Sequence, residues 1–106
     1  MIDINSALDN ASKTALKFAQ LDGEARMLEK FEKVLLSELV NQSNESSVAK
    51  AEHFARRHIK YKDHIEKMVE ARTNANIAKA EWEAIQMRFE SWRTLESTKR
   101  AEMNLR

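Results

Sequence analysis

The scarcity of turn-forming residues constrains the fold of this chain more than any other feature of its sequence. The 106 residues include one glycine and no proline, whereas proteins on average contain about 7% Gly and 5% Pro. Most tight turns use Gly or Pro, and a sheet needs a turn between successive strands, so sheet folds are disfavoured. At this length the chain forms one domain at most. The sequence therefore predicts a single all-α domain, residues 1–106, built from a few long helices.

The supply of large apolar residues is too small for a thick core. Leu, Ile, Val and Phe together number 23, close to the limit of roughly 20% below which chains tend to be disordered. Disorder is also typical of a high net charge, however, and here 18 basic and 17 acidic residues nearly cancel. Such a chain buries one stripe along each helix, and partner chains often supply the missing burial. We therefore expect a homo-oligomer, either a dimer or a larger assembly.

Apolar and small residues in the first arm, residues 4–40, recur at steps of three and four residues. This period near 3.5 is typical of a helix that packs along a coiled-coil seam. Asp3, Asn5 or Ser6 is the candidate N-cap. The seam stays in phase across Gly23, which predicts one helix through that residue. The seam consists of Ile4, Leu8, Ala11, Ala15, Phe18, Leu21, Ala25, Leu28, Phe31 and Leu35.

A run of seven polar residues at 41–47 is the one predicted loop, with Ser46 or Ser47 as candidate N-cap of the next helix. The second arm spans residues 48–104, and its longer part alone would reach roughly 68 Å as a helix. This length favours a long antiparallel helical hairpin or coiled coil within an oligomeric helical bundle. Arg72 interrupts the apolar seam, and polar seam residues can fix register. The seam runs through Tyr61, Ile65, Met68, Arg72, Ala75, Ala78, Trp82, Ile85, Phe89 and Trp92.

The aromatic part of this seam is a candidate interface, because burial of large aromatic side chains dominates interface energetics. Its residues share one helical face, which packs against either the first arm or a second subunit. The candidate interface residues are Tyr61, Ile65, Met68, Trp82, Ile85, Phe89 and Trp92. Apolar residues outside the two seams offer a second face for contacts between subunits: Leu36, Leu39, Val69, Ile77 and Leu95.

Charge divides unevenly along the chain. Residues 1–47 carry 5 basic and 8 acidic groups, whereas residues 48–106 carry 13 and 9. Clustered Lys and Arg with an aromatic residue, as found within 50–62, are typical of phosphate contact and base stacking. A solvated helix face that aids solubility has the same composition. The candidate nucleic-acid or anion site comprises Lys50, Arg56, Arg57, Lys60, Tyr61 and Lys62.

Several chemistries lack the residues they need. The absence of cysteine excludes disulfides, thiolate catalysis and Cys-ligated zinc. His53, His58 and His64 lie five and six residues apart, whereas a helical metal-binding pair needs i, i+3 or i, i+4 spacing. One glycine cannot build a phosphate-binding loop. We therefore expect no catalytic residues, no metal, no cofactor and no enzymatic activity.

No membrane or export signal is evident in the sequence. No apolar run approaches the ~20 residues of a membrane span, and the N-terminus lacks the basic and apolar regions of a signal peptide. We therefore expect a cytoplasmic protein, in a cell or in an infected host, that does not act at a membrane.

The C-terminal stretch AEWEAIQMRFESWRT at 80–94, followed by STKRAEM at 97–103, resembles the tail of small helical proteins encoded by bacteriophages and prophages. The genes of such proteins often lie near recombination or replication genes. Those relatives often carry a Ser-Pro-acid-Tyr break, which would fall at 58–61. Although proline is absent here, the resemblance implies a helix break near His58. It also implies a phage-related setting and work beside nucleic acid, and it supplies no catalytic residue.

Two functions suit these features. The first is a non-enzymatic interaction or assembly protein that acts through protein–protein contacts with a partner still to be identified. The alternative is a nucleic-acid-binding accessory of phage recombination or replication that uses the basic segment 50–62. Salt-dependent binding to DNA or RNA separates the two functions.

Overall fold

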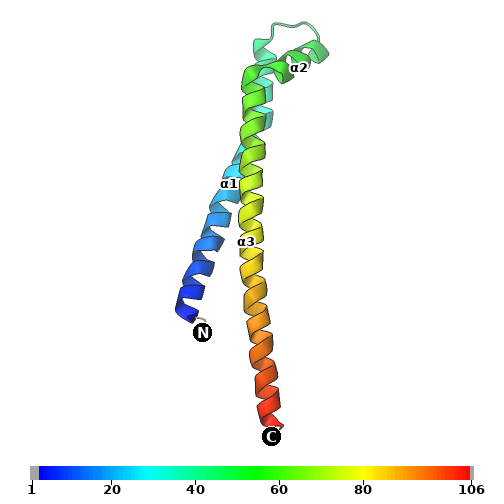
Figure 1. Cartoon of the computed structure of the whole chain (residues 1–106). Helices are drawn as coiled ribbons and strands as arrows, with labels where there is room; N and C mark the ends of the chain where they lie inside the picture. Colours follow the sequence, from blue (N-terminus) through cyan, green and yellow to red (C-terminus); the bar gives the residue numbers. More distant parts are fainter. Residues whose placement is uncertain (1–2, 106) are drawn as a thin grey trace.

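The computed structural model describes residues 3–105, which form three helices and no strand. Helix α1 spans Ile4–Gln42, α2 spans Val48–Arg57 and α3 spans Ile59–Asn104. Helices α1 and α3 run in opposite directions along each other, and the short α2 lies across one end of the pair (Figure 1). The predicted all-α helical hairpin is confirmed.

The molecule is a thin rod rather than a globule. Its principal extents are 84, 24 and 14 Å, and its Cα radius of gyration is 23.6 Å. A compact domain of 100 residues has a radius of gyration of about 13 Å. With 46 residues against 39, α3 is longer than α1 and continues past the start of α1 at the end opposite α2 (Figure 1).

Residues 43–47 connect α1 to α2. Asn44 has a positive φ of 57°, a left-handed conformation that Asn tolerates better than most residues. The Ser47 hydroxyl oxygen accepts a hydrogen bond from Lys50 N–H at 3.4 Å and caps α2. The loop is shorter than the predicted 41–47. That prediction rested on polarity alone, and exposed polar side chains also occur in the last turn of a helix.

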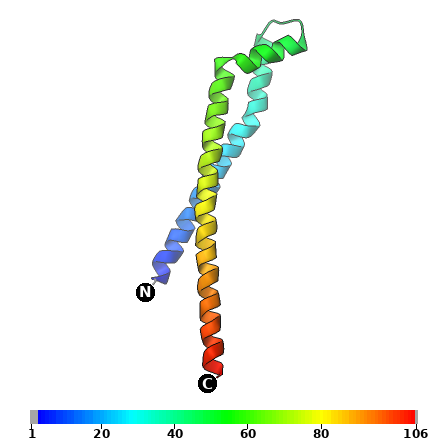
Figure 2. The ribbon, with the colours of Figure 1, turned by 45° about the vertical axis from the view of Figure 1, so that its right-hand side comes forward.

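A second break separates α2 from α3 at His58. This residue has an extended backbone, with φ −65° and ψ 140°. Its ring Nδ1 accepts a hydrogen bond from Lys60 N–H at 3.1 Å, which caps α3. The ring also meets Phe54 edge to face, with centroids 5.9 Å apart. The chain therefore turns without proline, and α2 crosses the end of the hairpin (Figure 2).

The core is a thin seam made mainly of alanine. Six of the seven buried residues in the described part of the chain are alanines, and only one large side chain is fully buried. Small side chains at a helix contact allow a short interaxial distance, so the helices pack closely without enclosing much apolar volume. The buried residues are Ala11, Ala25, Leu39, Ala51, Ala55, Ala75 and Ala78.

The seam of α1 departs from the prediction near α2. Phe31, predicted on the seam, is 54% exposed, and the neighbouring Glu32 faces α3 and bonds to Tyr61. Leu39, predicted outside the seam and available to a second subunit, is instead 1% exposed. A shift of one residue rotates a helical position by about 100°. The change from Phe31 to Glu32 is one such shift, whereas Leu39 lies four residues after the predicted seam residue Leu35, which stays partly buried. The seam therefore continues from Leu28 through Glu32 and Leu35 to Leu39.

Candidate functional site

An open groove lies where α1 and α3 diverge, at the end of the rod away from α2. The two helices separate towards the start of α1, beyond the buried alanines of their middle sections (Figure 1). The groove has a volume of about 780 Å³, within the range of roughly 300–1,000 Å³ typical of ligand sites. It is lined by Ile4, Ala7, Leu8 and Asn10 of α1 and by Ile85, Arg88, Phe89, Trp92 and Arg93 of α3.

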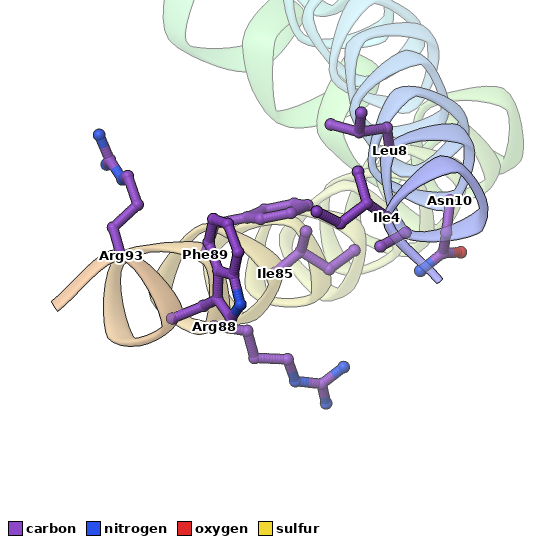
Figure 3. A pocket seen from close by; sticks show the side chains of 9 residues that line it. Ile4, Leu8, Asn10, Ile85, Arg88, Phe89 and Arg93 are labelled. Atoms are coloured by element: carbon purple, nitrogen blue, oxygen red, sulfur yellow. The ribbon is translucent and has the colours of Figure 1, made fainter. Parts of the chain in front are cut away.

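Large apolar side chains form the walls of this groove and remain accessible. Ile4 is 48% exposed, Leu8 52% and Trp92 40%. Figure 3 shows Ile85 and Phe89 of α3 pointing across towards α1, whereas the guanidinium groups of Arg88 and Arg93 extend away on opposite sides. The groove therefore has an apolar floor and walls and a positively charged rim.

The structure places the predicted interface residues along the face of α3 that packs on α1. Six of the seven are partly buried there, and the seventh, Trp92, is exposed at the open end. Of the two sequence-based alternatives, packing against the first arm accounts for most of the aromatic seam. What remains open to a second subunit is the groove end of that seam.

Two polar contacts fix the register of α1 against α3 in the half of the rod near α2. The Tyr61 hydroxyl donates a hydrogen bond to Glu32 Oε1 at 2.8 Å, and His64 Nε2 lies 2.7 Å from the Leu28 carbonyl oxygen. The carboxylate acceptor stabilises the protonated phenol and raises the pKa of Tyr61 above its ordinary value.

Arg72 forms the largest polar cluster between the two long helices. Its Nη1 donates to Asp22 Oδ1 at 2.8 Å, its Nε donates to Glu29 Oε2 at 3.3 Å, and Arg26 Nε also donates to Asp22, at 2.7 Å. The hydrogen bond from Arg72 lowers the pKa of Asp22. Sequence reasoning identified Arg72 and missed both carboxylates. Their spacing of seven residues, on either side of the buried Ala25, was the available signal.

The predicted basic site extends along α2 into the first turn of α3, with Lys50 in the first turn of α2 and the other basic residues on either side of His58. Its five basic side chains are all exposed, and none of them forms an ion pair with the residues the structure describes. Arg56 and Arg57 occupy the last turn of α2, where positive charge also favours the helix dipole. Tyr61, the predicted stacking residue, is partly buried with its hydroxyl bonded to Glu32. Four of the five basic residues thus lie within four residues of the bend at His58, and Tyr61 beside them is bonded to α1 rather than open for stacking.

The three histidines lie in different surroundings. His58 caps a helix and His64 bonds to a carbonyl oxygen, as described above, while His53 is exposed. Between residues 3 and 105, no group of three or more His, Asp or Glu side chains is arranged to hold a metal ion. Across the same residues, none of the helices combines the length and apolar character needed to cross a membrane.

No protein-family model matches the chain, and comparisons with curated proteins and with solved structures found no significant match. This protein is therefore characterised by its fold and its two surfaces. It is an elongated helical hairpin with an open apolar groove at one end and the exposed basic residues of the predicted site, which we call the basic corner, at the other.

Proposed function

We propose that this chain is a non-enzymatic helical assembly protein, which associates with itself and with partner proteins through the groove between α1 and α3. The observation that carries this proposal is the half exposure of Ile4, Leu8 and Trp92 around one groove. Contiguous exposed apolar surface is uncommon on soluble monomers and often marks an interaction site. Fully burying an exposed Leu or Ile side chain contributes about 1.5–3 kcal/mol, so covering the exposed half of Ile4 or Leu8 would contribute roughly half of that. A helix laid between two helices is a recurrent way to gain that burial.

The resemblance of the C-terminal half to phage-encoded helical proteins supports a phage-related setting for this role. In that setting the partner is a second copy of this chain or another protein made during infection. A pull-down from infected or lysogenic cells, with wild type and a groove variant as parallel baits, tests the second possibility.

A matched pair of leucine substitutions tests the groove. Leu8→Glu places a charge in the groove, and Leu16→Glu places the same charge on an exposed leucine of the same helix outside it. We expect wild type and L16E to be dimeric or larger by light scattering, with melting temperatures that rise with protein concentration. L8E should associate at least about tenfold more weakly, because it buries an unpaired charge. A wild type that stays monomeric, with concentration-independent melting, contradicts self-association.

A nucleic-acid-binding accessory is the second candidate function, supported by the five exposed basic residues that lack ion-pair partners among the described residues. Arg56→Glu with Arg57→Glu reverses two of these charges, and Lys30→Glu with Lys33→Glu makes the same net change on exposed positions of α1. If the basic corner binds nucleic acid, the first pair abolishes binding and the second does not. The wild-type affinity should fall with salt, at a log–log slope of roughly −0.7 per phosphate contact on single strands and −0.9 on duplex. Absence of binding at low salt would falsify this candidate.

A further inference from the structure

The C-terminal part of α3 has no helix packed against it within the described residues. The inter-helix contacts pair Tyr61 with Glu32 and Arg72 with Asp22 and Glu29, and the groove pairs the start of α1 with the stretch of α3 around Phe89 and Trp92. Beyond that stretch, residues 94–104 of α3 are exposed except for the partly buried Glu96. We call residues 94–104 the α3 tail. At 1.5 Å per residue, it is about 16 Å of uncovered helix.

The α3 tail is a helix that lacks a surface to pack on, whereas the groove is a surface that lacks a packed helix. The tail carries the exposed apolar residues Leu95 and Met103, and the groove is an apolar slot between two helices that lacks a third. Along α3 the groove extends from Ile85 to Arg93, about 12 Å, so the tail is long enough to cover it. Each copy of the chain has one groove and one tail.

We propose that the occupant of the groove is the α3 tail of a second copy, with the two α3 helices antiparallel and a twofold axis near Leu95. This inference rests on the proposed self-assembly and specifies its surface. Because of the twofold axis, each tail fills the groove of the other copy. Both apolar surfaces are then covered, and the assembly closes as a dimer. Parallel pairing would instead set tail beside tail and leave both grooves empty.

The charge pattern of α3 agrees with the antiparallel arrangement. With the axis at Leu95, Ile85 of one copy lies beside the exposed Leu105 of the second, and Arg88 lies beside Glu102 of the second. Neither Arg88 nor Glu102 has an ion-pair partner among the described residues of its own chain. Parallel pairing would place Arg88 against its own copy, and like charges at such flanking positions disfavour an alignment.

A charge swap tests the arrangement. Arg88→Glu turns the two attractive pairs of the dimer into repulsive ones, so dimerisation should weaken by about tenfold. Adding Glu102→Arg to that variant should restore most of the affinity. The two positions are 14 residues apart on one straight helix, about 21 Å, so rescue requires contact between copies. Circular dichroism confirms that each variant keeps its helicity.

A crosslink locates the axis independently, since the wild type has no cysteine. Leu95→Cys places a thiol beside the axis, where packed helix axes lie about 8–10 Å apart, and a short thiol–thiol crosslinker should join the two copies. Ser37→Cys, exposed on α1 near α2, lies about 100 Å from its copy in this arrangement and should not react. If wild type is dimeric but L95C does not crosslink or the charge swap gives no rescue, the inference is overturned and the proposed function stands. A monomeric wild type overturns both.

Discussion

Arg72 shows how one charged residue can sit in a helical seam without being buried alone. Its side chain is 33% exposed and reaches Asp22 and Glu29, which lie seven residues, or about two turns, apart on the facing helix. Partly exposed ion pairs add little stability, but a cation at a seam position excludes registers in which it faces an apolar side chain. We infer that Arg72 mainly sets how far α3 is shifted along α1, and thereby where the groove opens.

The lowered pKa of Asp22 gives this cluster a pH dependence. Arg72 holds the Asp22 carboxylate ionised below its ordinary pKa of 3.8, so the pair stabilises the fold above that pH, and the stabilisation is lost as pH falls through the lowered pKa. The Asp22→Asn variant should therefore have a lower melting temperature than wild type at pH 7, and this difference in melting temperature should shrink below pH 3.8. The control Asp9→Asn removes an exposed carboxylate that forms no ion pair among residues 3–105 and should match wild type throughout. A D22N deficit that is equal at every pH would argue against the ion pair.

At the scale of the helix, Gly23 weakens α1 without an evident steric reason. The helix continues through it with no positive φ, and a Cβ added there would meet nothing within 4 Å. Gly costs about 0.8–1.0 kcal/mol relative to Ala inside a helix, so Gly23→Ala should raise the free energy of unfolding by about 1 kcal/mol in urea titrations. Ala19→Gly, at another exposed position of α1, should lower it by a similar amount. If G23A instead destabilises the protein, α1 needs a bend that Ala resists.

The sequence predicted elements well where one periodicity decided the outcome. The seam of α3 from Tyr61 to Phe89 faces α1 as its spacing indicated, because apolar and small residues repeat there with only Arg72 intervening. The phase shift at Phe31 was not predictable from α1 alone, since it depends on the bond between Glu32 and Tyr61 of another helix. The groove was missed for a related reason: it arises from the divergence of two helices, and spacing within either helix does not report their separation.

At the scale of the whole molecule, the rod has many apolar side chains but little apolar interior. Large residues such as Leu8, Trp92 and Leu95 are 40% or more exposed, whereas the buried set is almost entirely alanine. Per residue, alanine contributes far less apolar area than Leu or Trp. Association that covers the groove end would therefore add burial that one hairpin cannot supply, and the stability of the fold would depend on protein concentration.

The fluorescence of the two tryptophans can report that association directly. Trp92 lies in the open groove and is 40% exposed, whereas Trp82 is partly buried against α1. Trp82→Phe leaves Trp92 as the only indole, and its emission should move to longer wavelength on dilution, because dissociation returns the ring to water. Trp92→Phe leaves only Trp82, whose surroundings belong to one chain, and its emission should stay constant while the helicity is unchanged. A Trp92 signal that is independent of concentration, in a protein that light scattering shows to dissociate, would place the contact between copies elsewhere on the rod.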